Sequence, residues 1–247
     1  IDFLNNKNHY GLKDARMAKT LGCLDLILAQ NELISKCYKT FYGLKNVVVL
    51  NNFRDVIPTK KNYAITEKMS LIYVARICKE KGIFDLIDAV NHLNEMNCRI
   101  TLDIFGEIQL KKDEKLVFCN CLSNTIKYLG VLNVEDSILT IKKYDLFVLP
   151  TKYIGEGTSG SLIEAFLSGT PALISSYSQA KLLISDGIDG FIYKINNQDD
   201  LISKLLFIYE NREKLENIGI SAQKKSIVYT FDYNKEAFVD YIIGGGR

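Results

Sequence analysis

Residues 145–171 (DLFVLPTKYIGEGTSGSLIEAFLSGTP) follow the order strand, glycine-rich loop, helix, strand, which restricts the fold more than any other stretch. The apolar run 146–149 predicts a short buried strand that Pro150 ends. An apolar helix is expected at 161–167, and the next strand candidate begins at Ala172. A helix N-terminus has unpaired N–H groups and a partial positive charge, so a helix opened by such a loop can bind a phosphate.

Two glutamates flank this loop and helix. Glu156 lies beside the loop and Glu164 within the helix, with seven residues between them. Each feature also has a structural explanation, because many loops carry glycines for turn geometry alone and a helical glutamate usually faces water. The loop by itself therefore leaves a phosphate site and a plain turn as alternatives.

Composition restricts the class of protein. The chain has 247 residues, 47% of them apolar and 24% charged, as is usual for a globular protein with a core. The net charge of +2 gives no basic surface for a nucleic acid. No apolar run approaches a membrane span and no signal peptide is visible, so we expect a cytoplasmic protein. The six cysteines have no metal-ligand spacing and are expected to be buried thiols in a reducing compartment: Cys23, Cys37, Cys78, Cys98, Cys119 and Cys121.

Strand and helix patterns alternate along the chain, which favours a doubly wound, mostly parallel α/β sheet covered on both faces. A polar stretch at 51–68 is the best boundary between domains. Strands are expected at 24–29, 46–50, 71–75, 99–105, 126–130, 146–149, 172–174 and 190–193. Helices are expected at 14–21, 32–41, 82–96, 111–121, 133–141, 161–167, 179–185, 196–209, 211–226 and 231–243.

Charged and polar residues follow the predicted strands at their carboxyl ends, where doubly wound sheets bind ligands. Arg76 and Lys81 follow the strand 71–75, and Glu107 follows the strand 99–105. Arg and Lys beside a helix N-terminus suit a diphosphate, because Arg can bind two oxygens at once and Lys adds a point charge. The alternative is a surface ion pair of these cations with Glu80 or Asp85.

The order and spacing of these motifs resemble the nucleotide-sugar-binding half of a retaining GT-B-fold glycosyltransferase. The class is often called family 4 or glycosyltransferases group 1. The resemblance covers residues 24–243 and is strongest in ARICKEKG (75–82), DIFGE (103–107), YLGVL (128–132), the stretch 144–171 and DGIDGFIY (186–193). It implies a Rossmann-like C-terminal domain of the GT-B fold.

The resemblance also implies roles. Arg76 and Lys81 would bind the donor diphosphate and stabilise its departure, and Glu156 would contact the transferred sugar. These three are the expected catalytic residues. Further donor contacts are expected from Glu164 to the ribose, from the backbone at Val131 to the base, and from Glu107, Gly157, Thr158, Ser159 and Gly160 to the substrate.

The reaction implied by the resemblance is the transfer of a sugar from a nucleoside-diphosphate sugar, with retention, to a glycan or lipid-linked acceptor in polysaccharide biosynthesis. No bound metal and no cofactor are expected. Arg, Lys and a helix dipole can stabilise a leaving diphosphate by themselves. Peripheral contact with the inner face of a membrane would involve a domain outside this sequence.

The sequence departs from the family pattern at several positions. Ile108 stands where a second glycine is usual, and Ala75 replaces another glycine. The stretch 180–185 lacks a common acidic residue. Thr158 and Ser159 stand where an aromatic residue and glycine are common. Only the close backbone approach near Ile108 is put in doubt by these changes.

Three segments are expected. Residues 1–52 would be a remnant of the N-terminal acceptor domain, 53–228 the nucleotide-sugar-binding domain, and 229–247 a helix that crosses back, with a flexible tail. His9 is a weak candidate for the catalytic histidine of the first domain. Two other functions remain open: a non-catalytic nucleotide-sugar-binding module, and a GT-B sugar-nucleotide epimerase.

Overall fold

The computed structural model describes residues 12–55 and 60–240, which form two compact units. One unit comprises the described parts of 1–56 and 227–247, and the other comprises those of 57–226. These boundaries lie near the expected ones at 52/53 and 228/229. That the smaller unit is a remnant of an acceptor domain stays a prediction, and His9 lies outside the described residues.

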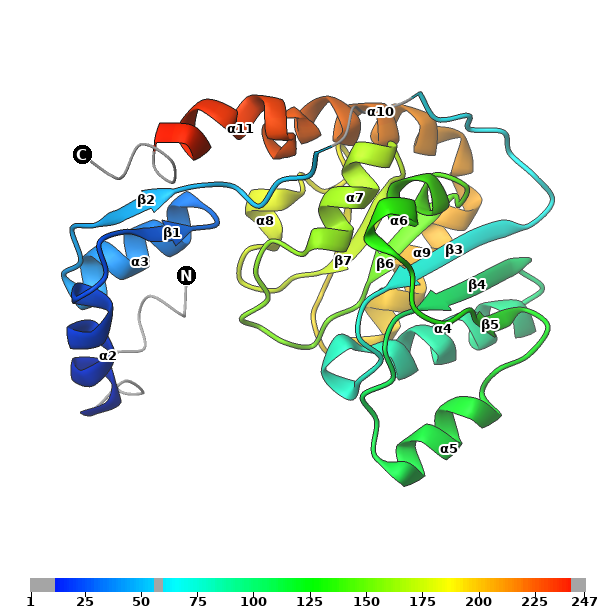
Figure 1. Ribbon diagram of the computed structural model, residues 1–247. Helices are drawn as coiled ribbons and strands as arrows, with labels where there is room; N and C mark the ends of the chain where they lie inside the picture. The colour runs from blue at the N-terminus through cyan, green and yellow to red at the C-terminus, as the bar shows by residue number, and fades with distance from the viewer. Residues whose placement is uncertain (1–11, 56–59, 241–247) are drawn as a thin grey trace. The chain divides into compact units, whose positions relative to one another are not determined.

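The larger unit is built on a parallel sheet of six strands in the order β5-β4-β3-β6-β7-β8 (Figure 1). This is the Rossmann order, in which the direction of winding reverses between β3 and β6. The predicted doubly wound α/β class is therefore confirmed. The strands are β3 (Met69–Val74), β4 (Ile100–Phe105), β5 (Ile126–Tyr128), β6 (Leu146–Leu149), β7 (Ala172–Ser175) and β8 (Phe191–Tyr193).

Helices cover both faces of this sheet (Figure 1). Helix α4 packs against α9 in one layer, while α7 packs against both α6 and α10 in the other. The helices are α4 (Ile83–Glu95), α5 (Lys112–Asn120), α6 (Val134–Ile141), α7 (Gly160–Ser168), α8 (Ala180–Leu183), α9 (Gln198–Glu210) and α10 (Leu215–Lys225), with 3-10 turns η1 (Lys79–Lys81) and η2 (Arg212–Lys214). A further 3-10 turn, η3 (Ser226–Tyr229), begins at the end of this unit and continues into the smaller one.

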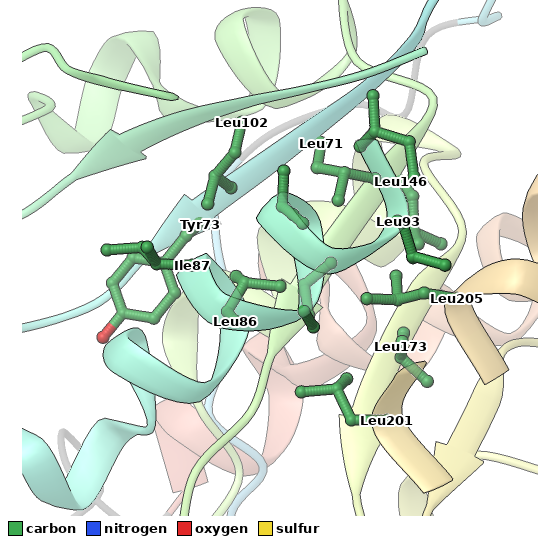
Figure 2. Packing of buried hydrophobic residues seen from close by; sticks show 14 of the residues in the cluster. Leu71, Tyr73, Leu86, Ile87, Leu93, Leu102, Leu146, Leu173, Leu201 and Leu205 are labelled. Atoms are coloured by element: carbon green, nitrogen blue, oxygen red, sulfur yellow. The ribbon is translucent and has the colours of Figure 1, made fainter. Parts of the chain in front are cut away.

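A large cluster of core residues lies between α4, α9 and one face of the sheet (Figure 2). Leu86 and Leu93 of α4 and Leu201 of α9 are completely buried there. Alternate strand residues such as Leu71 and Tyr73 face them, as the two-residue period of a strand requires. Burial of a Leu side chain stabilises a fold by roughly 2 kcal/mol, so this cluster fixes the sheet that carries the loops.

Two side chains, Lys61 and Tyr63, attach the segment that leads into β3 to the backbone at the ends of α6 and α7. Lys61 is 6% exposed, and its Nζ donates to the carbonyl oxygens of Lys142 at the end of α6 and Tyr144. Burial lowers the pKa of Lys61 to about 8. The Tyr63 hydroxyl donates to the Gly169 carbonyl at 2.7 Å, and burial raises the pKa of Tyr63 to about 12.

The smaller unit contains α2 (Leu12–Gly22), β1 (Ile27–Ala29), α3 (Glu32–Tyr42), β2 (Val47–Val49) and α11 (Phe231–Phe238). Strands β1 and β2 pair in parallel. Phe53 packs against Phe231 and Phe238 of α11, with ring centroids 5.7 and 6.0 Å apart. Residues 241–243 of the helix expected at 231–243 lie outside the described residues.

Two expectations need correction. The strand predicted at 24–29 begins only at Ile27, because the Leu24 N–H bonds the Leu21 carbonyl in the turn that follows α2. The cysteines are not all buried, since Cys23 and Cys119 are exposed and only Cys78 is buried. Within the described ranges, no helix is both long and apolar enough to cross a membrane.

Candidate functional site

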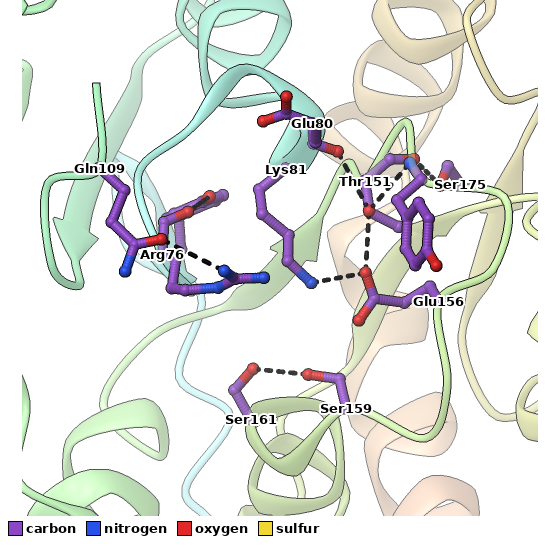
Figure 3. Close-up of polar contacts among 11 residues, drawn as sticks. Arg76, Glu80, Lys81, Gln109, Thr151, Glu156, Ser159, Ser161 and Ser175 are labelled. Atoms are coloured by element: carbon purple, nitrogen blue, oxygen red, sulfur yellow. Dashed lines mark hydrogen bonds and ion pairs between the residues drawn. The ribbon is translucent and has the colours of Figure 1, made fainter. Parts of the chain in front are cut away.

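The candidate residues meet at the carboxyl end of the sheet, between β3 and β6, where the strand order reverses. The chain leaves β3 through Arg76 and the turn η1, and it leaves β6 through Pro150 into the loop that opens α7. Ligands of doubly wound sheets bind at such a reversal. Figure 3 shows Arg76, Lys81, Glu156 and Ser159 around this point.

A glycine allows the two crossing segments to approach closely. Gly82 ends η1 with φ +72°, and a Cβ at this position would lie 1.9 Å from the Pro150 carbonyl oxygen. Only glycine adopts this backbone conformation without strain and also leaves room for Pro150. The contact brings Lys81, the preceding residue, beside the end of β6.

Lys81 and Glu156 form an ion pair, with Lys81 Nζ 2.5 Å from Glu156 Oε2. Their side chains are 13% and 10% exposed, so water screens the pair little. Lys81 therefore does not form the alternative pair with Glu80 or Asp85. Asp85 instead pairs with Lys152 at 2.8 Å.

Thr151 belongs to the same network. Its side chain is completely buried, and its hydroxyl lies 2.9 Å from Glu156 Oε2 (Figure 3). The Tyr153 N–H donates to this hydroxyl at 3.3 Å. Glu156 is therefore a buried carboxylate held by hydrogen bonds, as a buried charge requires.

Arg76 lies on the other side of Lys81 and is exposed. Its Nη1 donates to Gln109 Oε1 at 3.2 Å, and Gln109 Nε2 donates to Glu107 Oε2 at 2.7 Å. The hydroxyl of the buried Tyr73 donates to the Arg76 carbonyl at 2.8 Å. Burial raises the pKa of Tyr73 well above its usual range, so this donor keeps its proton.

The loop after β4 lies close to β3 despite the departures in its sequence. A Cβ at Gly106 would lie 1.9 Å from the Ala75 carbonyl oxygen, so the close backbone approach occurs at Gly106 itself. Ile108 forms a bridge with Ile77, which holds Glu107 and Gln109 beside Arg76.

The N-terminus of α7 faces the same point. Gly160 begins the helix, and the side chain of the N-cap residue Ser159 bonds Ser161 at 3.0 Å instead of capping the backbone. The first N–H groups of a helix have no partner within the helix, so they can meet an anion. Thr158 and Glu164 are each 5% exposed, which corrects the alternative of a Glu164 that faces water.

Val131 lies further along the sheet edge, after β5. The Gly106 N–H donates to the Gly130 carbonyl at 2.9 Å, so the segment at Val131 adjoins the Gly106 loop. The Val131 side chain is 69% exposed. The structure thus brings Lys81 and Glu156 into direct contact and joins Arg76 to Glu107 through Gln109.

Three polar residues at this edge were not singled out from the sequence: Thr151, Gln109 and Ser161. A hydroxyl directly after a strand-ending proline is the only signal that points to Thr151. Gln109 had none. Among the described residues, no three His, Cys, Asp or Glu side chains gather as they would around a metal ion.

The arrangement offers two cations, a helix N-terminus and a buried carboxylate to one ligand. The cations and the helix N-terminus suit a diphosphate. The carboxylate suits hydroxyl groups, because an ionised carboxylate accepts strong hydrogen bonds.

Comparison with known proteins relates the chain to glycosyltransferases. The family described as glycosyl transferases group 1 matches residues 57–225. The UDP-Gal:alpha-D-GlcNAc-diphosphoundecaprenol alpha-1,3-galactosyltransferase of Escherichia coli is 26% identical over 239 residues, covering 88% of this chain and 60% of the relative. An uncharacterised glycosyltransferase of Methanocaldococcus jannaschii is 28% identical over 169 residues, covering 68% and 43%. The chain spans about half the length of the curated relatives it matches.

Solved structures share the fold. HepE of Anabaena, solved with UDP-glucose, superposes with a TM-score of 0.78 at 17% identity, covering 98% of this chain and 70% of HepE. The pneumococcal O-GlcNAc transferase GtfA, solved with UDP and GlcNAc, gives 0.75 at 18% identity, covering 96% and 48%. These neighbours are GT-B proteins, as the motifs predicted. With its family match over 57–225, the chain belongs to the group 1 glycosyl transferases.

Proposed function

We propose that this chain is the donor-binding part of a retaining glycosyltransferase. It would bind a nucleoside-diphosphate sugar without a metal ion, and the sugar would pass to a glycan or a lipid-linked acceptor. The observation that carries the proposal is the meeting of Arg76, Lys81 and Glu156 beside the N-terminus of α7.

The cations act on the leaving group. As the bond between sugar and diphosphate breaks, negative charge develops on the diphosphate oxygens. Arg76 and Lys81 supply positive charge there, and the N–H groups of Ser159 and Gly160 add hydrogen bonds. Fixed donors of this kind stabilise developing charge without moving, which supports catalysis that needs no metal ion.

Glu156 acts on the sugar. Its Oε2 is held by Lys81 and Thr151, and its second oxygen is turned to the side of Ser159 and Ser161 (Figure 3). A sugar attached to a diphosphate at the α7 N-terminus would present its hydroxyl groups to this oxygen. Glu164, Val131, Gly157 and Thr158 stay proposed donor contacts, to the ribose, the base and the phosphates.

The acceptor and the retaining course of the reaction are inferred from likeness. The motifs resemble those of retaining enzymes, and the Escherichia coli relative is named for a lipid-linked acceptor. Uridine nucleotides are the first donors to try, because this relative is named for UDP-Gal and the HepE and GtfA structures were solved with UDP-glucose and with UDP.

The test is calorimetric titration of the protein in EDTA with UDP-, GDP- and ADP-glucose and with UDP, GDP and ADP. We expect saturable binding of one nucleotide series. Arg76→Ala should lose about tenfold or more in affinity for both members of that series, as expected for a charged hydrogen bond to phosphate. Arg99→Ala is the matched control, because Arg99 lies at the opposite end of the sheet, before β4, where it pairs with Glu67.

Absence of binding to all six ligands in EDTA, with binding restored by Mg²⁺, would contradict metal independence. Absence of binding under both conditions would contradict the donor-site assignment. Binding without sugar transfer by the longest available form of the protein would instead favour the non-catalytic binding module.

A further inference from the structure

Thr151 occupies an unusual place for a hydroxyl group. It directly follows Pro150, which ends β6, and it is completely buried. A buried hydroxyl needs a hydrogen-bond partner, and its loss is costly when the partner is charged. The partners of Thr151 therefore show what the residue does.

The hydroxyl has one proton and two acceptors within reach. Glu156 Oε2 lies at 2.9 Å and the Glu80 carbonyl oxygen at 3.2 Å. The carboxylate is both nearer and charged, so it is the stronger acceptor. The Tyr153 N–H donates to a lone pair of the same hydroxyl, so the hydroxyl proton stays available for Glu156.

Thr151 itself is held rigidly by elements on either side. The Ser175 hydroxyl at the end of β7 donates to the Thr151 carbonyl (Figure 3). The Lys152 N–H donates to the Glu80 carbonyl at 2.8 Å. The threonine is thus tied to β7 and to η1. Through its hydrogen bond, Thr151 can restrict the movement of Glu156, which lies in a loop.

Lys81 cannot hold Glu156 in place in every state of the site. It is the other donor to Glu156 Oε2, and the proposed function also assigns it to the diphosphate. When a donor phosphate attracts Nζ, the threonine hydroxyl is the remaining hydrogen-bond donor to Oε2 among the contacts seen here.

We propose that Thr151 is a positioning residue that keeps Glu156 oriented toward the transferred sugar while Lys81 binds the diphosphate. The inference rests on the proposed function for its consequence in donor binding. Its geometric part, the coupling of Thr151 to Glu156, stands without any ligand.

The test compares Thr151→Val, which keeps the shape and removes the hydroxyl, with Thr151→Ser, which keeps the hydroxyl. Thr170→Val is the matched control, because Thr170 is also completely buried and its hydroxyl also donates to a carbonyl, that of Ile141. The probes are UDP-, GDP- and ADP-glucose and the three free nucleoside diphosphates, titrated calorimetrically.

Thr151→Val should lose about tenfold in affinity for the bound nucleotide sugar, the effect of one hydrogen bond to a charged group. The loss for the free diphosphate should stay below about twofold on the same reasoning. Thr151→Ser should restore the affinity for the sugar nucleotide. An equal loss for both ligands, or the same loss in Thr170→Val, would overturn the proposal.

A ligand-free arm separates this inference from the proposed function. Urea unfolding of wild type, Thr151→Val, Glu156→Ala and the double variant gives the coupling between the two residues. A coupling of about fivefold in the unfolding equilibrium constant supports the contact, and one below about twofold overturns it. If wild type binds none of the six ligands, the proposed function fails, and this coupling alone decides the role of Thr151.

Discussion

Lys81 Nζ lies 2.5 Å from Glu156 Oε2, and the two residues come from segments on either side of the strand reversal. The diphosphate-binding cation and the sugar-binding carboxylate proposed above therefore neutralise each other in the ligand-free structure. A donor would replace one buried contact of Lys81 by another instead of leaving the charge unpaired. This relationship connects the stability of the site to its proposed chemistry.

Removal of one member of this pair should destabilise the protein. Lys81→Met leaves the Glu156 carboxylate buried without its cation, which typically costs about 3 kcal/mol in the free energy of unfolding. Lys79→Met is the control, since Lys79 pairs with Glu114 but its side chain is 63% exposed. That variant should cost less than about 1 kcal/mol. Urea unfolding measures both, and similar losses in the two variants would show that the buried pair is not special.

Gly82 should tolerate alanine poorly. The new Cβ would meet the Pro150 carbonyl at 1.9 Å, and the positive φ adds strain. We expect Gly82→Ala to cost at least about 2 kcal/mol more than Gly187→Ala. Gly187 is a fair control because its φ is +77° and no atom lies within 4 Å of a Cβ there. Equal losses of thermal stability in the two variants would contradict the close approach at Gly82.

The lowered pKa of Lys61 should make the stability of the folded protein depend on pH. Burial lowers the pKa of Lys61 from 10.5 to about 8 in the folded protein. Between these values the unfolded chain binds more protons, so the contribution of Lys61 to the free energy of unfolding rises with pH, and below about pH 8 it is flat. This contribution to the free energy of unfolding can rise by about 1.4 kcal/mol per pH unit.

The measurement for Lys61 is urea unfolding of wild type and Lys61→Met at several pH values from about 7 to about 10. Methionine binds no proton, and other titrating groups cancel in the difference between the two proteins. As the pH rises, the free energy of unfolding of wild type should increase relative to that of the variant. A constant difference across this range would contradict the lowered pKa.

Much of the fold could be predicted because each buried strand and amphipathic helix is a local pattern. Gly43 ends α3 in the left-handed conformation, as expected from its place after the helix. Asn197 caps α9 by accepting from the Asp200 N–H. Errors arose at element ends, where tertiary contacts decide. The helix expected at 179–185 stops at Leu183, because Ile184 is already extended.

The site was less predictable. The motifs indicated Arg76, Lys81 and Glu156, but their contacts depend on the strand order. It brings β3 beside β6, so that Lys81 and Glu156 meet although they lie 75 positions apart in the sequence. Thr151 and Gln109 owe their places to packing that no local pattern encodes. The roles of all these residues in donor binding stay predictions.

The central claim is that the cations bind the diphosphate while Glu156 binds the sugar. The most direct measurement is the affinity of wild type and Glu156→Gln, in EDTA, for the nucleotide sugar and its free nucleoside diphosphate. The account predicts a loss of about tenfold for the nucleotide sugar, with affinity for the free diphosphate unchanged or raised because Lys81 is released from its ion pair. An equal loss for both ligands would contradict it.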